Sequence, residues 1–171
     1  LLLANGMAGN AEVDSPESEG YEELQQAVTL VAVELAKMVA FDGEGATKHV
    51  TIEVMGGASR QDAHRAAMAV AKSPLVKTAL YGRDANWGRI LCAVGYSGVP
   101  VDPQRVELWL GDLHLVHQGR PYDVNEARAA EILAQVDIDI ALDLGMGRER
   151  ATVWTCDLSH DYVSINAEYR T

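Results

Sequence analysis

Glu44 is the residue whose neighbours most directly suggest a chemical role in this sequence of 171 residues. It stands between Gly43 and Gly45, where a long segment with an apolar stripe ends and a β-rich segment begins. Glycine tolerates positive φ and has no Cβ, so the two glycines allow a loop to present the Glu44 carboxylate to a ligand. The same residues are also typical of a helix C-cap followed by a turn with a solvated Glu44. Taken alone, the stretch favours this simpler interpretation.

The histidines and cysteines show no spacing that is typical of a catalytic or metal site. His114 and His117 are three residues apart on a predicted strand, so we expect them to point to opposite faces and not to chelate one metal ion. Cys92 and Cys156 lie far apart and form no Cys-x-x-Cys pair. We therefore predict structural or surface roles for the histidines, reduced thiols for the cysteines, and no bound metal.

The composition indicates a globular protein with one good core, because 48% of the residues are apolar. The net charge of −11 would repel phosphate backbones and anionic lipids, so nucleic acid and membranes are poor partners and a cationic substrate is a better one. The apolar run 28–40 is broken by Glu34 and Lys37, and no run approaches the roughly 18 residues that a bilayer requires. These observations predict a protein without a transmembrane helix, and the two reduced cysteines favour a cytoplasmic location.

The hydrophobic periodicity predicts a mixture of helices and strands, and therefore an α/β (α+β) fold. Helices are predicted for residues 21–41, 60–72, 87–96 and, capped by Asn125, as far as about residue 135. Strands are predicted for residues 48–55, 75–81, 106–110, 113–118, 138–144, 151–156 and 161–167. Residues 1–4 have the composition of a buried strand that a segment from elsewhere would complete. A weak boundary near residue 100 would divide a main α/β segment, 1–99, from a smaller lobe, 100–171, unless the chain is one domain.

Four stretches, read together, resemble the β chain of the ornithine acetyltransferase family, the glutamate N-acetyltransferases of the cyclic arginine pathway. They are LLLANG at 1–6, DGEGATK at 42–48, DANWGRI at 84–90 and INAEYRT at 165–171. Together they extend from the first residue to the last in the order expected of that family. The one departure is Ala85, where the family more often has proline.

The resemblance implies a fold of mixed sheets layered with helices, as in ornithine acetyltransferases and self-cleaving aminopeptidase-like proteins, completed by a separate α chain. It also implies a precursor that cleaves itself before a threonine, whose hydroxyl then accepts the acyl group. That threonine is expected upstream of Leu1, and the oxyanion hole is expected on the α chain. No threonine of this sequence is N-terminal, so we expect the chain alone to be inactive.

The resemblance carries three residues over to the substrate site: Glu44, Asn166 and Thr171. Glu44 can pair with an ammonium group, Asn166 offers a donor and an acceptor, and Thr171 offers a hydroxyl. The implied reaction is ping-pong transfer of an acetyl group from N-acetylornithine to glutamate, with acetyl-CoA as a further donor in some members. It requires no metal or cofactor, and the implied assembly is a heterotetramer of two α and two β chains.

Two other functions remain compatible with the sequence. A related aminopeptidase or amidase with an N-terminal nucleophile would use the same self-cleavage but transfer the acyl group to water. A non-catalytic binding or assembly module would leave Glu44 solvated. The ending from Asn166 to Thr171 matches the transferase and argues against the hydrolase.

Overall fold

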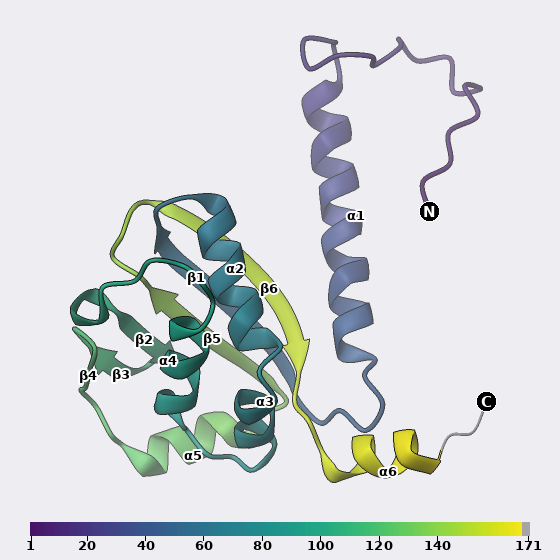
Figure 1. Cartoon of the computed structure of the whole chain (residues 1–171). Helices are drawn as coiled ribbons and strands as arrows, with labels where there is room; N and C mark the ends of the chain where they lie inside the picture. Colours follow the sequence, from purple (N-terminus) through teal and green to yellow (C-terminus); the bar gives the residue numbers. More distant parts are fainter. Residues whose placement is uncertain (169–171) are drawn as a thin grey trace. The chain divides into compact units, whose positions relative to one another are not determined.

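The structure is a computed structural model that describes residues 1–168 (Figure 1). The chain divides into two compact units, residues 1–36 and the remainder from residue 37. The first unit contains an irregular segment, 1–20, and most of α1 (Tyr21–Phe41). The second unit contains the sheet and the other helices, and it carries every site discussed below.

The predicted helix at residues 21–41 is confirmed as α1. The strand that residues 1–4 would form with a segment from elsewhere stays a prediction. Leu1, Leu2 and Leu3 are exposed and form no strand, because a strand needs a neighbouring backbone and no segment within residues 1–168 pairs with them. α1 is the one helix in that range whose length and composition would allow it to cross a membrane. Core helices and signal sequences pass the same test, so it is weak evidence for a membrane span.

The second unit is built on one six-stranded mixed sheet with the order β4-β3-β2-β5-β1-β6. β1 pairs with β5 in parallel and with β6 antiparallel, and the pairs β5–β2, β2–β3 and β3–β4 are all antiparallel. The strands are β1 (His49–Gly57), β2 (Glu107–Leu110), β3 (Leu113–His117), β4 (Arg120–Pro121), β5 (Asp137–Asp143) and β6 (Glu149–Cys156).

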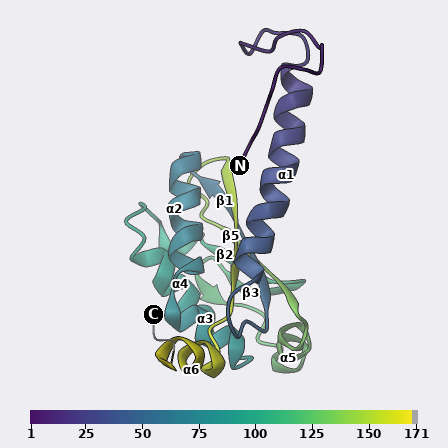
Figure 2. The same cartoon turned by 90° about the vertical axis from the view of Figure 1, so that its right-hand side faces the viewer.

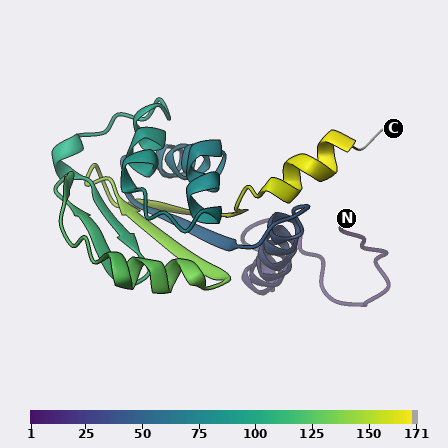
Figure 3. The same ribbon diagram turned by 90° about the horizontal axis from the view of Figure 1, so that it is seen from below.

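Helices α2 (Arg60–Ala71), α3 (Pro74–Tyr81) and α4 (Trp87–Gly95) lie on one side of this sheet, as Figures 2 and 3 show from two directions. Helix α5 (Glu126–Ala134) lies at the end of the sheet, at the bottom of Figure 1, and a 3-10 turn, η1 (Pro103–Arg105), precedes β2. Alternate residues of β1, such as Val50 and Ile52, are fully buried, and α2 packs on β1 and β6 through small side chains such as Ala66. The apolar face of the sheet and these helices therefore form the core, as the α+β prediction requires.

Two predicted strands are helices instead. Residues 75–81 form α3, since Ser73 caps the helix, Pro74 occupies its first turn, and Val76, Ala79 and Leu80 are buried at helical spacing. The Ser-Pro pair that marks the end of α2 thus also marks the start of the next helix.

The second case is α6 (His160–Glu168), where a strand at 161–167 was expected. β-branched Val163 and Ile165 favour a strand by propensity. The Ser159 hydroxyl accepts a hydrogen bond from the Tyr162 amide at 3.2 Å, which caps the first turn of a helix and overrides that preference.

The remaining predicted elements are confirmed within a few residues, including the β2–β3 hairpin, whose turn uses Gly111 at φ 56°. One sheet contains both β1, which precedes residue 100, and β2 to β6, which follow it. The boundary predicted near residue 100 stays a prediction.

We predict that Ser73→Ala lowers the free energy of unfolding by about 1 kcal/mol, the usual cost of losing an N-cap. Ser73 is buried and its hydroxyl accepts from the Val76 amide at 3.4 Å, so α3 loses its capping bond. Urea denaturation followed by circular dichroism measures the change. Exposed Ser164→Ala is the control and should stay within roughly 0.5 kcal/mol of the parent protein. Equal values for both variants would contradict the assignment of Ser73 as the cap.

Candidate functional site

The loop that carries Glu44 connects the end of α1 to the start of β1. A turn closed by the Ala46 amide and the Gly43 carbonyl, 2.9 Å apart, forms its middle. Gly45 has φ +69°, and a Cβ there would lie 2.8 Å from the Tyr162 amide nitrogen and 2.9 Å from Asp161 Cβ. Glycine is therefore required at residue 45 both for the turn and for the close approach of α6.

Asp157, which follows β6, holds the end of the Glu44 loop by hydrogen bonds. Its Oδ1 accepts hydrogen bonds from the amides of Thr47 at 2.7 Å and Lys48 at 3.0 Å, and its Oδ2 accepts from the Thr47 hydroxyl at 2.6 Å. The side chain is only 3% exposed. A buried carboxylate with three donors fixes the position of the segment that follows Glu44.

Ser159 joins the same loop to α6. Its hydroxyl donates to the Gly45 carbonyl at 2.6 Å while accepting from the Tyr162 amide. The start of α6 is thereby held against the turn of the loop, and the His160 ring makes a T-shaped contact with the Tyr81 ring at the end of α3. Sequence analysis missed Asp157 because its partners, the Thr47 and Lys48 amides, are more than a hundred residues away. It missed Ser159 because the residues that this hydroxyl caps were predicted to form a strand.

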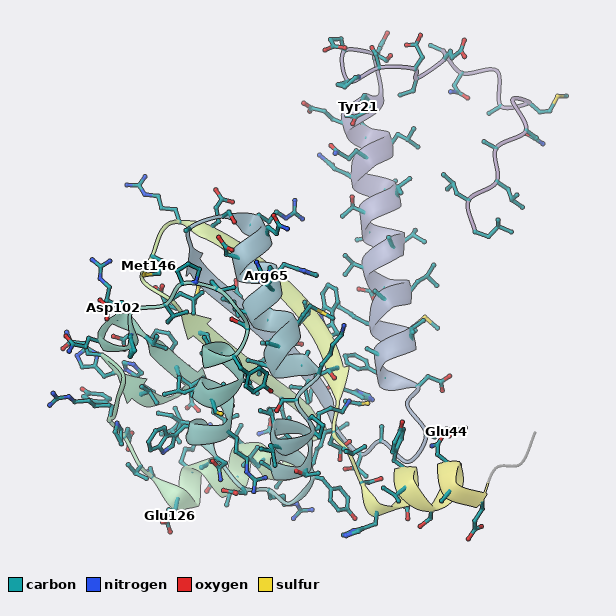
Figure 4. All side chains as sticks on the ribbon, viewed as in Figure 1. Tyr21, Glu44, Arg65, Asp102, Glu126 and Met146 are labelled. Carbon is teal, nitrogen blue, oxygen red and sulfur yellow. The ribbon has the colours of Figure 1, made fainter. Side chains whose placement is uncertain are left out.

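These anchors bring Glu44 and Asn166 together. Asn166 Nδ2 donates to Glu44 Oε2 at 2.9 Å and to the Tyr162 carbonyl, also at 2.9 Å. Both side chains are exposed, and Figure 4 shows Glu44 on the loop beside α6. Thr171, the third residue expected at this site, lies outside the described residues.

The pair presents hydrogen-bond acceptors on an open surface. Because both protons of the Asn166 amide are used by Glu44 and Tyr162, the amide orientation is fixed and its Oδ1 remains an acceptor. Glu44 keeps Oε1 and the unused lone pair of Oε2. Two neighbouring acceptors, one of them a carboxylate, suit a cationic group such as an ammonium.

Lys48 lies just beyond this loop but is turned into the protein. It is buried, and its Nζ donates to the Gln135 carbonyl at 2.6 Å. Burial lowers the pKa of Lys48 and the positive charge of Arg83 lowers it further, whereas Asp157 opposes the change. Lys48 therefore connects the loop to the end of α5 and does not add a charge to the exposed surface.

The DANWGRI stretch at 84–90 forms the start of α4. Asn86 caps the helix by accepting from the Arg89 amide at 3.2 Å, and its Nδ2 donates to Asp84 Oδ2 at 3.0 Å. With Arg83 and the beginning of α5, this turn lines a cleft of about 300 Å³. In this stretch Asn86 acts as the N-cap of α4, and Gly88 and Arg89 lie in the first turn of that helix.

The prediction that His114 and His117 point to opposite faces is wrong. β2 and β3 shift register between Leu108 and Trp109, so β3 carries one extra residue, Leu115, at this point. The bulge turns both histidines toward Glu107, whose Oε2 lies 2.7 Å from His114 Nε2 and 3.0 Å from His117 Nδ1.

Glu107 is the acceptor for this second polar cluster. Burial by itself raises the pKa of Glu107, but hydrogen bonds from the Gln118 amide and the two histidines outweigh it, so the pKa lies below its ordinary value. β5 and β1 lie between β2 and β6 in the sheet, so the cluster is separate from the Glu44 loop.

Comparison with known proteins gives a consistent family assignment. The model of the ArgJ family matches residues 1–171. "Arginine biosynthesis bifunctional protein ArgJ" of Symbiobacterium thermophilum is 50% identical over 171 residues, which is 100% of this chain and 42% of the relative. A mitochondrial protein of that name from Schizosaccharomyces pombe is 50% identical over 176 residues, 99% of this chain and 39% of the relative. The chain thus spans about two fifths of these relatives.

A solved structure agrees with the fold. The crystal structure of arginine biosynthesis bifunctional protein ArgJ from Bacillus halodurans superposes with a TM-score of 0.89 at 41% identity. The match covers 93% of this chain and 75% of the crystallised chain. The predicted ornithine acetyltransferase fold is therefore confirmed.

We predict that Asp157→Ala lowers the free energy of unfolding by about 3 kcal/mol, because the Thr47 and Lys48 amides lose a buried acceptor. Amide hydrogen exchange should rise at residues 42–48 while β1 remains protected. The control is exposed Asp161→Ala in the first turn of α6, where the loss should be roughly 0.3–1 kcal/mol. Unchanged exchange in the loop of Asp157→Ala would refute the anchoring role.

Proposed function

The chain belongs to the ArgJ family, and we propose that it is the β chain of an acetyltransferase that moves an acetyl group from N-acetylornithine to glutamate. Two findings support this proposal. The relatives are named bifunctional proteins of arginine biosynthesis, and this chain corresponds to about two fifths of their length, as one product of a cleaved precursor would.

The observation that carries the proposal is the contact between Glu44 and Asn166. These residues are 122 positions apart and meet at 2.9 Å on an exposed surface. A buried carboxylate, Asp157, and a capping hydroxyl, Ser159, hold the two segments in place. We infer that the pair binds the free ammonium group of N-acetylornithine, with Glu44 supplying the charge and Asn166 Oδ1 a second acceptor.

In the proposed reaction, a threonine hydroxyl outside this chain attacks the acetyl carbonyl. Oxyanion donors on the α chain stabilise the tetrahedral intermediate, the C–N bond breaks, and ornithine leaves as its amine takes up the threonine proton. The amine of glutamate then attacks the acetyl ester, and the threonine regains its proton. Glu44 and Asn166 bind and orient the amino acid and transfer no proton.

The proposed enzyme contains an α chain from the same precursor, in an assembly of two α and two β chains. Thr171 is proposed as a further substrate contact, and acetyl-CoA as an additional acetyl donor. A cytoplasmic location is proposed for this protein, although the name of the Schizosaccharomyces pombe relative places that protein in mitochondria.

We predict that Glu44→Gln in the complete enzyme lowers kcat/KM for N-acetylornithine by roughly 10–100-fold. A hydrogen bond to a charged group contributes about 1.5–3 kcal/mol, and the substitution removes the charge while keeping the shape. Steady-state transfer of acetyl to glutamate, at varied N-acetylornithine, measures the effect.

The matched control is Asp42→Asn, which removes an exposed carboxylate from the same loop two residues away. This variant should retain kcat/KM within about twofold, because charges that are exposed and distant contribute little. Equal losses in both variants would indicate a general effect of loop charge, and no loss in Glu44→Gln would exclude an ammonium-binding role for Glu44.

A further inference from the structure

The β-bulge in β3 creates a cluster that a regular strand could not form. Trp109 pairs with His114 and Leu108 with Val116, which leaves Leu115 as the extra residue. Val116 is consequently buried beside Leu108, and His117 is turned to the same face as His114. Bulges commonly re-aim side chains in this way next to functional sites.

The three side chains in this cluster converge on one point. One ligand atom from each of Glu107, His114 and His117 lies within 4.8 Å of the other two. Their side chains are 19%, 25% and 47% exposed, respectively, so solvent reaches the cluster from one side while the strands close the other.

Neighbouring groups fix the orientation of all three. The Gln118 amide donates to Glu107 Oε1 at 3.0 Å, which leaves Oε2 directed at the histidines. Gln118 is held at φ 49°, an uncommon conformation for a non-glycine residue that points this amide at the carboxylate.

Aromatic rings hold the two imidazoles. Trp109 stacks on His114 with centroids 4.6 Å apart, and the Tyr122 ring lies 5.0 Å from His114 and 5.2 Å from His117. Outer contacts of this kind orient the ligands of known metal sites.

We propose that Glu107, His114 and His117 form a binding site for a divalent transition-metal ion of the Zn²⁺ class. Two imidazole nitrogens and one carboxylate oxygen are the donors that such ions prefer, whereas Mg²⁺ and Ca²⁺ prefer oxygen donors alone. Three protein ligands leave a fourth position open to water on the exposed side. On binding, the ion replaces the hydrogen bonds that now join the rings to Glu107.

The consequence of binding is local. The ligands come from both strands of the β2–β3 hairpin, so the ion would fasten the hairpin at the side of the sheet remote from α6 (Figure 1). The inference does not depend on acetyl transfer, since β5 and β1 separate this cluster from the loop with Glu44.

The test is calorimetric titration of Zn²⁺ into the complete protein without a histidine tag. We expect one saturable site per chain, absent with Mg²⁺. His117→Ala and the isosteric Glu107→Gln should each weaken Zn²⁺ binding at least about tenfold, because even outer-shell substitutions commonly cost 10–100-fold. The control, exposed His64→Ala on α2, should bind as the parent does.

A second readout uses the ring that stacks on His114. Co²⁺ binding should quench tryptophan fluorescence in the parent protein, and Trp109→Phe should remove the quenching while Zn²⁺ still binds. Absence of a saturable Zn²⁺ site, or affinity that is unchanged in both His117→Ala and Glu107→Gln, would overturn the proposal. So would equal weakening in His64→Ala.

Discussion

The buried carboxylate of Asp157 holds the candidate substrate site together. It accepts hydrogen bonds from both backbone amides at the end of the Glu44 loop, and it lies where β6 leaves the sheet toward α6. Without it, two amides would lose their acceptor and the loop would no longer be fixed to the strand that leads to Asn166. The exposed contact between Glu44 and Asn166 therefore depends on a buried one, which gives an exposed pair a defined geometry.

Much of the fold could be predicted because its signals are local. Asn125 caps α5 where the sequence indicated, and the buried alternation of β1 follows its apolar pattern. α3 and α6 could not be assigned correctly, because short segments with β-branched residues fit both periods and only the caps at Ser73 and Ser159 decide between them.

In the candidate site, too, the residues could be selected from the sequence but their contacts could not be predicted. Resemblance to a family selected Glu44 and Asn166, but their contact depends on how the start of β1 meets the end of β6. Asp157 has no local signature, since an acid after a strand is common. The His114–His117 pair was misjudged because a single extra residue in β3 reverses the face of everything that follows it, and a bulge leaves no distinct trace in one sequence.

The most direct test of this account is a crystal structure of the complete enzyme with bound ornithine. The account predicts an ammonium nitrogen within about 2.7–3.2 Å of both a Glu44 carboxylate oxygen and Asn166 Oδ1, with Asp157 still bound to the Thr47 and Lys48 amides. Ornithine bound elsewhere, with Glu44 and Asn166 in contact only with each other and solvent, would contradict it.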